Sequence, residues 1–315
     1  MRDSPTILWR GELTTRRSLR RRGLGVLAPA LFWLTIFLVL PSIATALAAF
    51  AQRGELRGQI EWSLTFDNFK RLVGFGLFGW SADHMVIFAR SVWIAAVTTC
   101  LSLLLAYPLA FFIATRKPGW RYPLLALVMV PFCTNIVIRV YAWQQLLAHD
   151  MPIARLAASL RLVRPGSSLC PSTLAVYIGM VSTFLPFAVL PLYASVERLD
   201  WSIVEAARDL YASRWRIFRH AILPQTRAAL QVATILAFIP AMGTFVVPDL
   251  LGGGRYMLAG SLIQQQFGGS DVPFGAAISL ALMVLTLGGL FLLRRSGESG
   301  AAAAGELAQV REAAP

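Results

Sequence analysis

The sequence has almost no lysine and lacks the short patterns on which most enzymes depend. Lys70 and Lys117 are the only lysines among 315 residues, and neither belongs to a GxxxxGK[ST] loop, which cradles the phosphates of ATP. No HExxH, no GxSxG and no pair of catalytic carboxylates occurs either. The sequence therefore predicts no catalytic residues, no metal site and no nucleotide bound by this chain, and nothing in it favours a membrane enzyme.

Acidic residues and cysteines are also scarce. The 16 Asp and Glu face 29 Lys and Arg, which leaves a formal net charge of +13. None of the acids lies in a long apolar stretch, where proton-coupled carriers often keep a carboxylate, so a self-powered carrier is disfavoured. A standalone secondary transporter or channel stays open as the alternative from a different class. Cys100, Cys133 and Cys170 are too few and too scattered for a disulfide framework or a metal site.

Apolar residues, in contrast, are abundant: they make up 57% of the chain, and the mean hydropathy is +0.62. Apolar stretches with little or no charge, each near or above the ~20 residues that cross a bilayer, recur six times. They are Gly23–Gln52, Ser91–Thr115, Tyr122–Ile138 (continuing past Arg139 to Ala148), Cys170–Val196, Ala228–Pro248 and Val272–Leu293. The prediction is an all-α, polytopic membrane protein with six transmembrane helices.

Basic residues set the expected orientation, because cytoplasmic loops carry more Arg and Lys than loops on the other side. With the N-terminus in the cytoplasm, the inner segments hold seven, three, six and three of them, 19 of the 29. Both termini are therefore expected in the cytoplasm, and the positive charge reflects this bias rather than a surface for nucleic acid.

The predicted organisation has four parts. Residues 1–23 form a basic cytoplasmic tail, and residues 24–87 form the first transmembrane helix with an extracytoplasmic loop. Residues 88–293 form the transmembrane core, which includes a cytoplasmic loop at 197–227. Residues 294–315 are of low complexity and are predicted to be a disordered cytoplasmic tail.

One polar segment interrupts the apolar pattern. EAARDLYASRWRIFRHAILP, Glu205 to Pro224, is charged and amphipathic, and it ends at a proline, which disfavours helix at the residue before it. Ser202 stands three residues before Glu205, the spacing of a capping box that starts a helix. A continuous helix would share one apolar face among Ala207, Tyr211, Trp215, Phe218 and Ile222.

The alternative is a break at Ala212-Ser213 that leaves two short helices, the second capped by Ser213. Such a segment could lie on lipid headgroups. It could equally seat its small Ala206-Ala207 surface in the groove of a partner protein, with charges at the rim. The residues alone leave both choices open.

The pattern EAARDLYAS…ILP resembles the EAA segment between the fourth and fifth spans of binding-protein-dependent ABC importer permeases. The similarity extends over residues 66–293. Several strings are similar to the spermidine/putrescine branch of these permeases: RSVWIAAVTT (Arg90–Thr99), YPLAFFIA (Tyr107–Ala114), IRVYAW (Ile138–Trp143), LPFAVLPLYASVERLD (Leu185–Asp200), LLGG (Leu250–Gly253) and LIQQQF (Leu262–Phe267).

The resemblance implies partners and a division of labour. It implies a coupling segment that docks on a separate ATPase and includes Glu205, Ala206, Ala207, Asp209, Tyr211, Leu223 and Pro224. It also implies three protein partners: an ABC ATPase dimer, a second homologous permease and an extracytoplasmic substrate-binding protein. The two permeases would lie in the lipid bilayer of the bacterial inner membrane. ATP would be bound by the partner subunit, this chain would hold no cofactor, and transport would run inward.

Two departures from the family pattern bear on mechanism and substrate. Tyr211 stands where a glycine is expected, and a left-handed tyrosine would cost ~1–2 kcal/mol, so the turn is expected to be made differently. Thr244 stands where the polyamine branch often has an acid, which leaves Asp249 as the nearest counter-charge. A polyamine is the expected substrate, and an opine, an amino-acid derivative or an iron chelate is the alternative.

Arg139 has two readings. A straight third helix would place it about 26 Å from Arg121, near the outer interface, where its charge could snorkel into water. Alternatively, Arg139 faces the substrate path beside Tyr141 and Trp143 and favours carboxylates. These three residues, with Thr244 and Asp249, are the predicted path residues.

Overall fold

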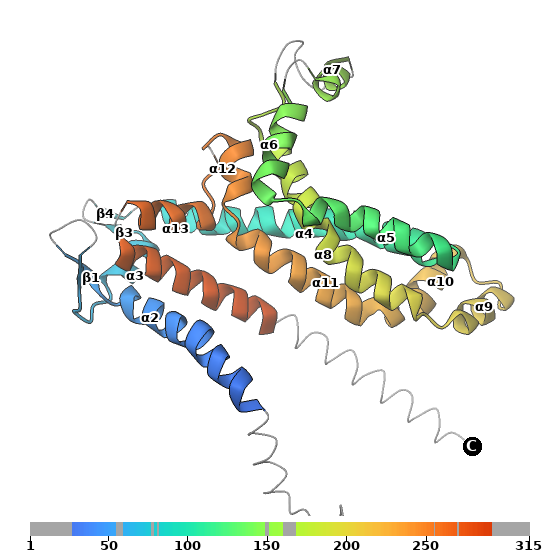
Figure 1. Ribbon diagram of the computed structural model, residues 1–315, viewed down its shortest axis with the longest axis horizontal. Coiled ribbons are helices and arrows are strands. Elements are labelled where there is room, and N and C mark those ends of the chain that lie inside the picture. The colour runs from blue at the N-terminus through green and yellow to red at the C-terminus, as the bar shows by residue number, and fades with distance from the viewer. Residues whose placement is uncertain are drawn as a thin grey trace, which may run out of the picture.

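The computed structural model describes residues 27–54, 59–76, 79–80, 82–148, 151–159, 168–254, 256–269 and 271–291. The two predicted cytoplasmic tails, residues 1–23 and 294–315, lie outside these residues. The described residues are mostly helical (Figure 1). The strands among these residues form two small antiparallel hairpins: β1 (Gln52–Arg53) with β2 (Ile60–Glu61), and β3 (Phe75–Gly76) with β4 (Gly79–Trp80).

Among the described residues, five helices are long and apolar enough to cross a membrane, and two more helices, which meet at a bend of 94°, count as a sixth if they are one broken span. In chain order they are the first long helix (Leu27–Ala49, which contains the π-helix η1, Thr35–Val39, and α2, Leu40–Ala49), α4 (Asp83–Ala114), the bent pair α5 (Pro118–Cys133) and α6 (Ile136–Leu146), α8 (Thr173–Glu197), a helix of 30 residues, Arg214–Gly243, and the last long helix, Val272–Phe291.

The helix Arg214–Gly243 is itself composite: it joins α10 (Arg214–Ile217), the π-helix η2 (Phe218–Ile222) and α11 (Leu223–Gly243). The remaining helices are short. They are α3 (Asp67–Val73), α7 (Pro152–Ser159), α9 (Trp201–Asp209), α12 (Val246–Gly252) and α13 (Ala259–Gly268).

The core lies where α4, α8 and α11 pack side by side (Figure 1). Alanines from the three helices meet there without solvent exposure, among them Ala106, Ala188 and Ala233. Small residues let helix backbones approach closely, which is how helices associate where lipid removes the hydrophobic driving force. Gly179 of α8 serves the same end, because a Cβ there would collide with Leu251 of α12.

The first long helix stands apart from this core, and none of its most apolar window is buried. Among the described residues, its contacts are at the C-terminal end, where Ala48 and Ala49 pack against Ala276 and Ala277 of the last long helix. The buried Asn68 of α3 donates two hydrogen bonds to the carbonyls at that end, 3.0 Å to Ala49 and 2.8 Å to Ala51. A side chain distant in sequence thus satisfies carbonyls that a helix end leaves unpaired.

Two predicted spans have the wrong extent. The third is not continuous from Tyr122 to Ala148, because Thr134 is extended and Asn135 caps a new helix by accepting a 2.8 Å hydrogen bond from the backbone N–H of Val137. The fifth was expected at Ala228–Pro248. Its helix instead begins at Arg214 and ends at Gly243, since Thr244 turns to an extended conformation and α12 begins at Val246.

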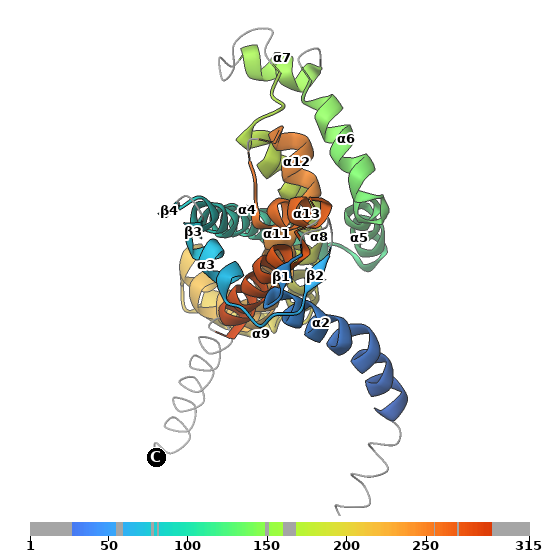
Figure 2. The same ribbon diagram turned by 90° about the vertical axis from the view of Figure 1, so that its left-hand side faces the viewer.

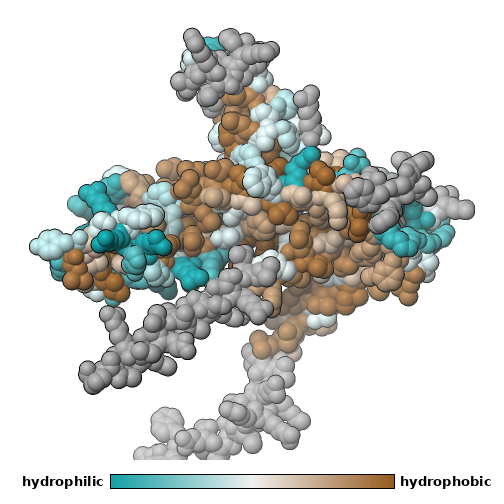
Figure 3. Space-filling view, turned by 180° about the vertical axis from the view of Figure 1, so that it is seen from behind, coloured by the Kyte–Doolittle hydropathy of each residue, from teal (hydrophilic) through white to brown (hydrophobic). Residues whose placement is uncertain are grey.

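Figure 3 shows hydrophobic residues over the middle of the molecule and hydrophilic residues gathered toward two ends. One end carries α9 and α10, and the other carries α3 with the hairpins (Figure 1). The expectation of a helical protein with several membrane-spanning segments is confirmed at this level.

Candidate functional site

The polar segment folds into two short helices, α9 and α10, at one end of the bundle (Figure 1). The capping box predicted at Ser202 is wrong, because α9 already begins at Trp201 and its N-cap is Asp200. The Asp200 carboxylate accepts from the backbone N–H of Ser202 at 3.0 Å and from its hydroxyl at 2.7 Å. Asp200 is as good a cap as serine, and it comes earlier in the chain.

The turn after α9 is left-handed at Tyr211, where φ is 53°. The backbone N–H groups of Leu210, Tyr211 and Ala212 bond back to carbonyls of α9, at 3.2, 2.9 and 3.1 Å. This is the closure that a glycine normally gives at a helix end. The expectation that the turn would be made differently is therefore wrong: tyrosine adopts the glycine conformation and bears a cost of ~1–2 kcal/mol.

Of the two alternatives for the segment, the broken helix is confirmed. Ser213 caps α10, and its hydroxyl accepts from the backbone N–H of Arg216 at 3.4 Å. The single apolar face is wrong, because the side chain of Tyr211 is 97% exposed while Ala207 is half-buried. The left-handed turn rotates α10 away from the line of α9.

The inner face of the segment is held by a small apolar cluster. Val204 of α9, Ile217 of α10 and Ala221 of η2 are buried together, and Phe111 of α4 packs against them. The outer face carries the exposed Glu205, Ala206 and Asp209, three of the predicted coupling residues. Between the two helices lies a hollow of about 400 Å³, which Ala206 and Ala207 line together with Leu210, Ala212 and His220.

Leu223 and Pro224 do not end the helix as the sequence indicates. Leu223 keeps helical dihedrals, and its N–H bonds to the carbonyl of Phe218, five residues back. This wider π turn sits directly before the proline, where an ordinary helical turn would set the ring against a carbonyl. The helix therefore runs from α10 into α11 without a break.

A chain of aromatic rings connects this segment to the core. Trp215 stacks on Phe218 with 5.6 Å between ring centroids, and Phe218 meets the ring of Tyr107 of α4 edge-on, also at 5.6 Å. The hydroxyl of Tyr107 lies 2.6 Å from that of Thr226 of α11. A displacement of α10 would thus be felt by both α4 and α11.

Arg139 is bonded to the end of the helix that precedes its own. The 94° bend invalidates the straight-helix estimate, and the guanidinium Nη2 turns back to the end of α5. There it donates to the carbonyls of Thr134 at 2.9 Å and Phe132 at 3.4 Å. A cation on the carbonyl end of a helix complements the helix dipole. Arg139 therefore ties α6 to α5, while its buried Nε and Nη1 have no partner among the described residues.

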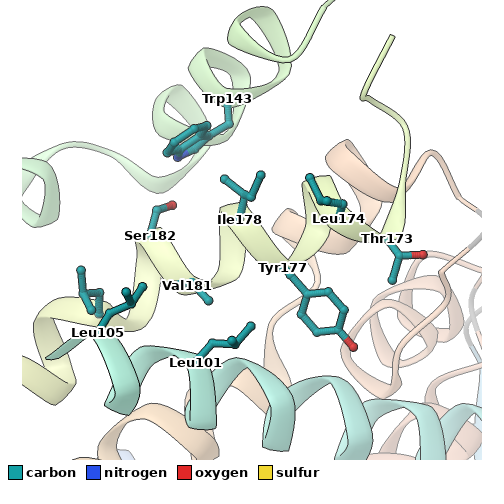
Figure 4. A pocket seen from close by; sticks show the side chains of 10 residues that line it. Leu101, Leu105, Trp143, Thr173, Leu174, Tyr177, Ile178, Val181 and Ser182 are labelled. Carbon is teal, nitrogen blue, oxygen red and sulfur yellow. The ribbon is translucent and has the colours of Figure 1, made fainter. Parts of the chain in front are cut away.

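Tyr141 and Trp143, predicted together as path residues, face different surroundings. Trp143 lines an apolar groove of about 770 Å³ with Leu101 and Leu105 of α4 and one face of α8. Figure 4 shows its indole facing α8 across from Ile178 and Ser182. Tyr141 is exposed and does not line this groove. Figure 2 shows α6 leading away from the bundle toward α7.

Thr244 and Asp249 lie on the segment between α11 and α13. Thr244 ends α11, and a Cβ added to Gly260 of α13 would come within 2.9 Å of the Thr244 carbonyl, so the two helix ends touch. The half-buried Asp249 accepts a 2.7 Å hydrogen bond from the hydroxyl of Ser261. A carboxylate has several acceptor sites, so the single bond from Ser261 does not exhaust those of Asp249.

Sequence reasoning missed an ion-pair cluster at the other end of the molecule. The buried Asp271 lies 3.2 Å from the guanidinium of Arg71 and 4.0 Å from that of Arg53. It also accepts from the backbone N–H of Phe274 at 3.3 Å, and Arg71 lies 4.2 Å above the ring of that residue. An aspartate directly before an apolar run is a cap signal that could have been found; its arginine partner, 200 residues away, could not.

These features define a polytopic, helical membrane protein: long apolar helices around a core of small residues, with a polar two-helix segment at one end. The chain belongs to the family of binding-protein-dependent transport system inner membrane components, whose profile matches residues 26–297. This family consists of transport components, so the chain is a transport subunit of a bacterial inner membrane and not an enzyme.

Relatives cover most of the chain. The spermidine/putrescine transport system permease protein PotB of Haemophilus influenzae is 32% identical over 271 residues, which are 84% of this chain and 91% of that protein. PotB of Escherichia coli K12 is 35% identical over 262 residues, 83% of this chain and 92% of that protein. A bacterial ABC transporter involved in alginate import has the same fold, with a TM-score of 0.65, 18% identity and coverage of 90% and 98%.

Proposed function

We propose that this chain forms, with a second homologous permease, the path by which an ATP-driven ABC importer carries a polyamine into a bacterial cell. The identity of 32–35% to PotB permeases over more than four fifths of the chain carries the proposal. An extracytoplasmic binding protein delivers the polyamine, and an ABC ATPase dimer supplies the energy. The PotB relatives do not favour the opine, amino-acid derivative or iron chelate alternatives.

The proposed topology has six spans, with α5 and α6 as one broken span and both termini in the cytoplasm. The coupling loop then faces the cytoplasm with α9 and α10. Reporter fusions after Thr115 and within 205–224 are expected to report cytoplasm, and fusions near Gln59 and Gly166 the outside. An inside signal near Gly166 would contradict six spans.

The coupling role is assigned to the outer face of α9 and to the turn that follows it. Glu205, Ala206 and Asp209 are exposed there, and Ala207 lines the hollow beside them. Small side chains over a hollow suit a groove contact with the ATPase, and the flanking charges suit its rim. Leu223 and Pro224 act behind this contact, since they join the segment to α11.

A positively charged amine of the substrate would bind at Asp249, and aromatic faces along the path would attract the same charge. The carboxylate of Asp249 keeps free acceptor capacity beside Ser261, and an aromatic face such as that of Trp143 attracts cations. Arg139 is less suited to repel the polyamine than the sequence alone indicates, because it is bonded to the end of α5. Thr244 lies five residues before Asp249, at the start of the same segment.

Uptake into vesicles tests the function. The purified permeases and ATPase are reconstituted with ATP on the ATPase side, and the binding protein is added on the other side with labelled spermidine. Accumulation that needs both ATP and the binding protein is expected. Accumulation in the absence of both ATP and the binding protein would instead identify a standalone carrier or channel. Uptake of a carboxylate solute but not of spermidine would refute the polyamine assignment.

Thr244→Glu sharpens the test of substrate charge, because it adds an acid to the segment that carries Asp249. Spermidine uptake is expected to be kept or raised, whereas an anionic solute would be repelled at low dielectric. Thr244→Gln is the uncharged control of similar size. Loss of spermidine uptake in Thr244→Glu but not in Thr244→Gln, with the complex assembled, would contradict a cationic substrate.

A further inference from the structure

We propose that a cavity between α9, α10 and α4, the headgroup cavity, binds the phosphate group of an anionic phospholipid, with Arg208 and Arg214 as its cationic partners. The cavity has a volume of about 550 Å³. The proposal requires only that the chain lies in a membrane. It therefore goes beyond the proposed function and depends on neither the substrate nor the ATPase.

The headgroup cavity is distinct from the hollow of about 400 Å³ beside the predicted coupling residues. Trp201, Val204 and Arg208 are three and four residues apart on α9, so they share the face that lines the cavity. Other residues of α9 line the hollow. Phe111 of α4 lines the cavity but not the hollow, so the cavity lies on the side of α9 that faces the bundle.

The cavity lies where membrane-spanning helices reach one end of the bundle. Phe111 is in the last turn of α4, and Ile222 is in the first third of the helix Arg214–Gly243. Both helices are long and apolar enough to cross a membrane. Figure 3 shows hydrophilic residues gathered toward this end next to the hydrophobic middle. Phospholipid headgroups occupy that boundary, and tryptophan, here Trp201, is a typical residue of it.

The charges of the cavity call for an anion. Arg208 and Arg214 are exposed, and neither has an ion pair within the part of the chain that the structure describes. The other residues that line the cavity are apolar or aromatic, so the lining itself supplies no acid. The planar fork of a guanidinium matches two oxygens of a phosphate, which makes arginine the better phosphate partner of the two basic side chains.

The apolar part of the cavity decides between a lipid and a free phosphate. Phe111, Val204 and Ile222 offer contacts that inorganic phosphate cannot use but that the glycerol backbone and the first acyl carbons of a phospholipid can. A net negative headgroup is also preferred to a zwitterionic one, because two guanidiniums repel the ammonium group of the latter. The ligand class is therefore an anionic phospholipid such as phosphatidylglycerol.

The remaining arginines of the segment are left for a protein partner. Arg216 lines the hollow on the other side of the two helices, and Arg219 lines neither space. The sequence left open whether the segment lies on headgroups or in the groove of a partner. The two spaces show that one segment can do both, with a different side for each.

Thermal unfolding of the purified full-length permease in detergent tests the proposal. A ligand that binds the folded state raises the melting temperature by mass action, so titration with dioctanoyl-phosphatidylglycerol gives an apparent affinity. Arg208→Gln combined with Arg214→Gln is expected to weaken that affinity by at least about tenfold, since the charge-assisted bonds to phosphate are lost. Arg219→Gln, which removes a charge from the same segment outside the cavity, is the matched control and is expected to keep the affinity.

Four results would overturn the proposal. The first is an unchanged affinity in the double variant, and the second is an equal loss in Arg219→Gln, which would reduce the effect to the overall charge of the segment. The third is equal stabilisation by dioctanoyl-phosphatidylcholine, which would show that the arginines do not select the ligand. The fourth is equal stabilisation by inorganic phosphate, which would identify a site for free phosphate.

Photochemical cross-linking locates the bound headgroup. The full-length chain is placed in vesicles of phosphatidylethanolamine and phosphatidylglycerol, the latter with a diazirine on its headgroup, and the cross-linked residues are identified by mass spectrometry. Cross-links within residues 201–214 are expected in the unaltered chain and are expected to disappear in the double variant. Cross-links there that persist in the double variant, or cross-links confined to other parts of the chain, would contradict the proposal.

Discussion

The two polar ends of the molecule give particular charged and aromatic side chains different surroundings. At the end with α3, the carboxylate of Asp271 is 5% exposed and has two arginine partners, and Phe50 and Phe69 pack with 5.1 Å between ring centroids. At the end with α9 and α10, Tyr211 is exposed to solvent, and four exposed arginines have no ion pair in the described chain: Arg208, Arg214, Arg216 and Arg219.

The difference identifies which end is complete by itself. Charges and amide groups that are satisfied within the chain hold its own elements together, as Asn68 holds the end of the first long helix. Groups left open suit a contact with another molecule. We therefore expect substitutions at the first end to lower stability, and substitutions at the second end to lower transport with little change in stability.

The largest effect is expected from a charge placed on the outer face of α9. Glu205→Lys or Ala206→Arg puts a misplaced charge into the ATPase contact, which costs about 2–4 kcal/mol, so uptake falls by a factor on the order of 100. Ala206 is a better site than Ala207, since Ala207 also packs on the buried cluster of the chain itself. The measurement is spermidine uptake by vesicles with equal amounts of inserted permease.

Membrane insertion and thermal stability are the controls for that experiment. Both are expected to stay unchanged, because these side chains contact neither the core nor the other end. Normal uptake and normal ATPase association in either variant would show that the outer face of α9 is not the docking surface.

Asp271→Asn is expected to give the largest loss of stability. It removes the negative partner of Arg71 and Arg53 and leaves a buried amide among donors, which costs about 2 kcal/mol. Asp209→Asn, at the open end, is the matched control and changes the free energy of unfolding by less than about 0.5 kcal/mol. Thermal unfolding in detergent measures both, and equal losses would abolish the distinction between the two ends.

Asn68→Ala is expected to cost about 1–2 kcal/mol, because it leaves the carbonyls of Ala49 and Ala51 without the side-chain donor. The same residue bonds to the end of the first long helix that packs against the last long helix, so hydrogen exchange there should rise. Asn68→Asp tests the direction of the bonds, since a carboxylate cannot donate to a carbonyl and should be at least as damaging. Protection unchanged in both variants would contradict the anchoring role.

Tyr107→Phe is expected to have a smaller effect, about 1 kcal/mol, since it removes one hydrogen bond to Thr226 and keeps the edge-on ring contact with Phe218. If the aromatic chain links α10 to the core, ATP hydrolysis per molecule of spermidine transported should rise in Tyr107→Leu and less in Tyr107→Phe. A constant ratio in both variants would show that the chain of rings carries no coupling.

The smallest effect is expected at Asp67, which is exposed. Hydrogen bonds from Thr65 and Lys70, with the charge of Lys70, hold the pKa of Asp67 below its ordinary value. Its contribution to stability is therefore present above the ordinary carboxyl pKa and is lost as the pH falls through the lowered pKa. Unfolding curves at pH 7 and pH 3 for Asp67→Asn and the unaltered chain measure it, and a larger effect at pH 3 than at pH 7 would contradict the sign.

Length and hydropathy were sufficient to predict the long helices, because a bilayer demands long apolar stretches whatever their neighbours. They could not predict the 94° bend, since the cap at Asn135 and the bonds from Arg139 to the end of α5 depend on local geometry. Asp200 shows a similar limit: two good caps stood close together, and only the fold decides which one starts α9.

The polar segment was found by its pattern of charge, but its turn was not. Intrinsic preference argues against a left-handed tyrosine, and the fold overrides that preference at Tyr211. The pairing of Asp271 with Arg71 was invisible for another reason, because an ion pair across 200 residues leaves no mark in either local sequence.

Cysteine labelling at one position on each end tests the contrast most directly. Ala206→Cys and Phe66→Cys, both exposed positions, are introduced into the chain with its own cysteines replaced, and labelling rates are measured with and without the ATPase. The account predicts that the ATPase slows labelling at position 206 by at least about tenfold and leaves position 66 unchanged. Equal labelling rates at position 206 with and without bound ATPase would contradict it.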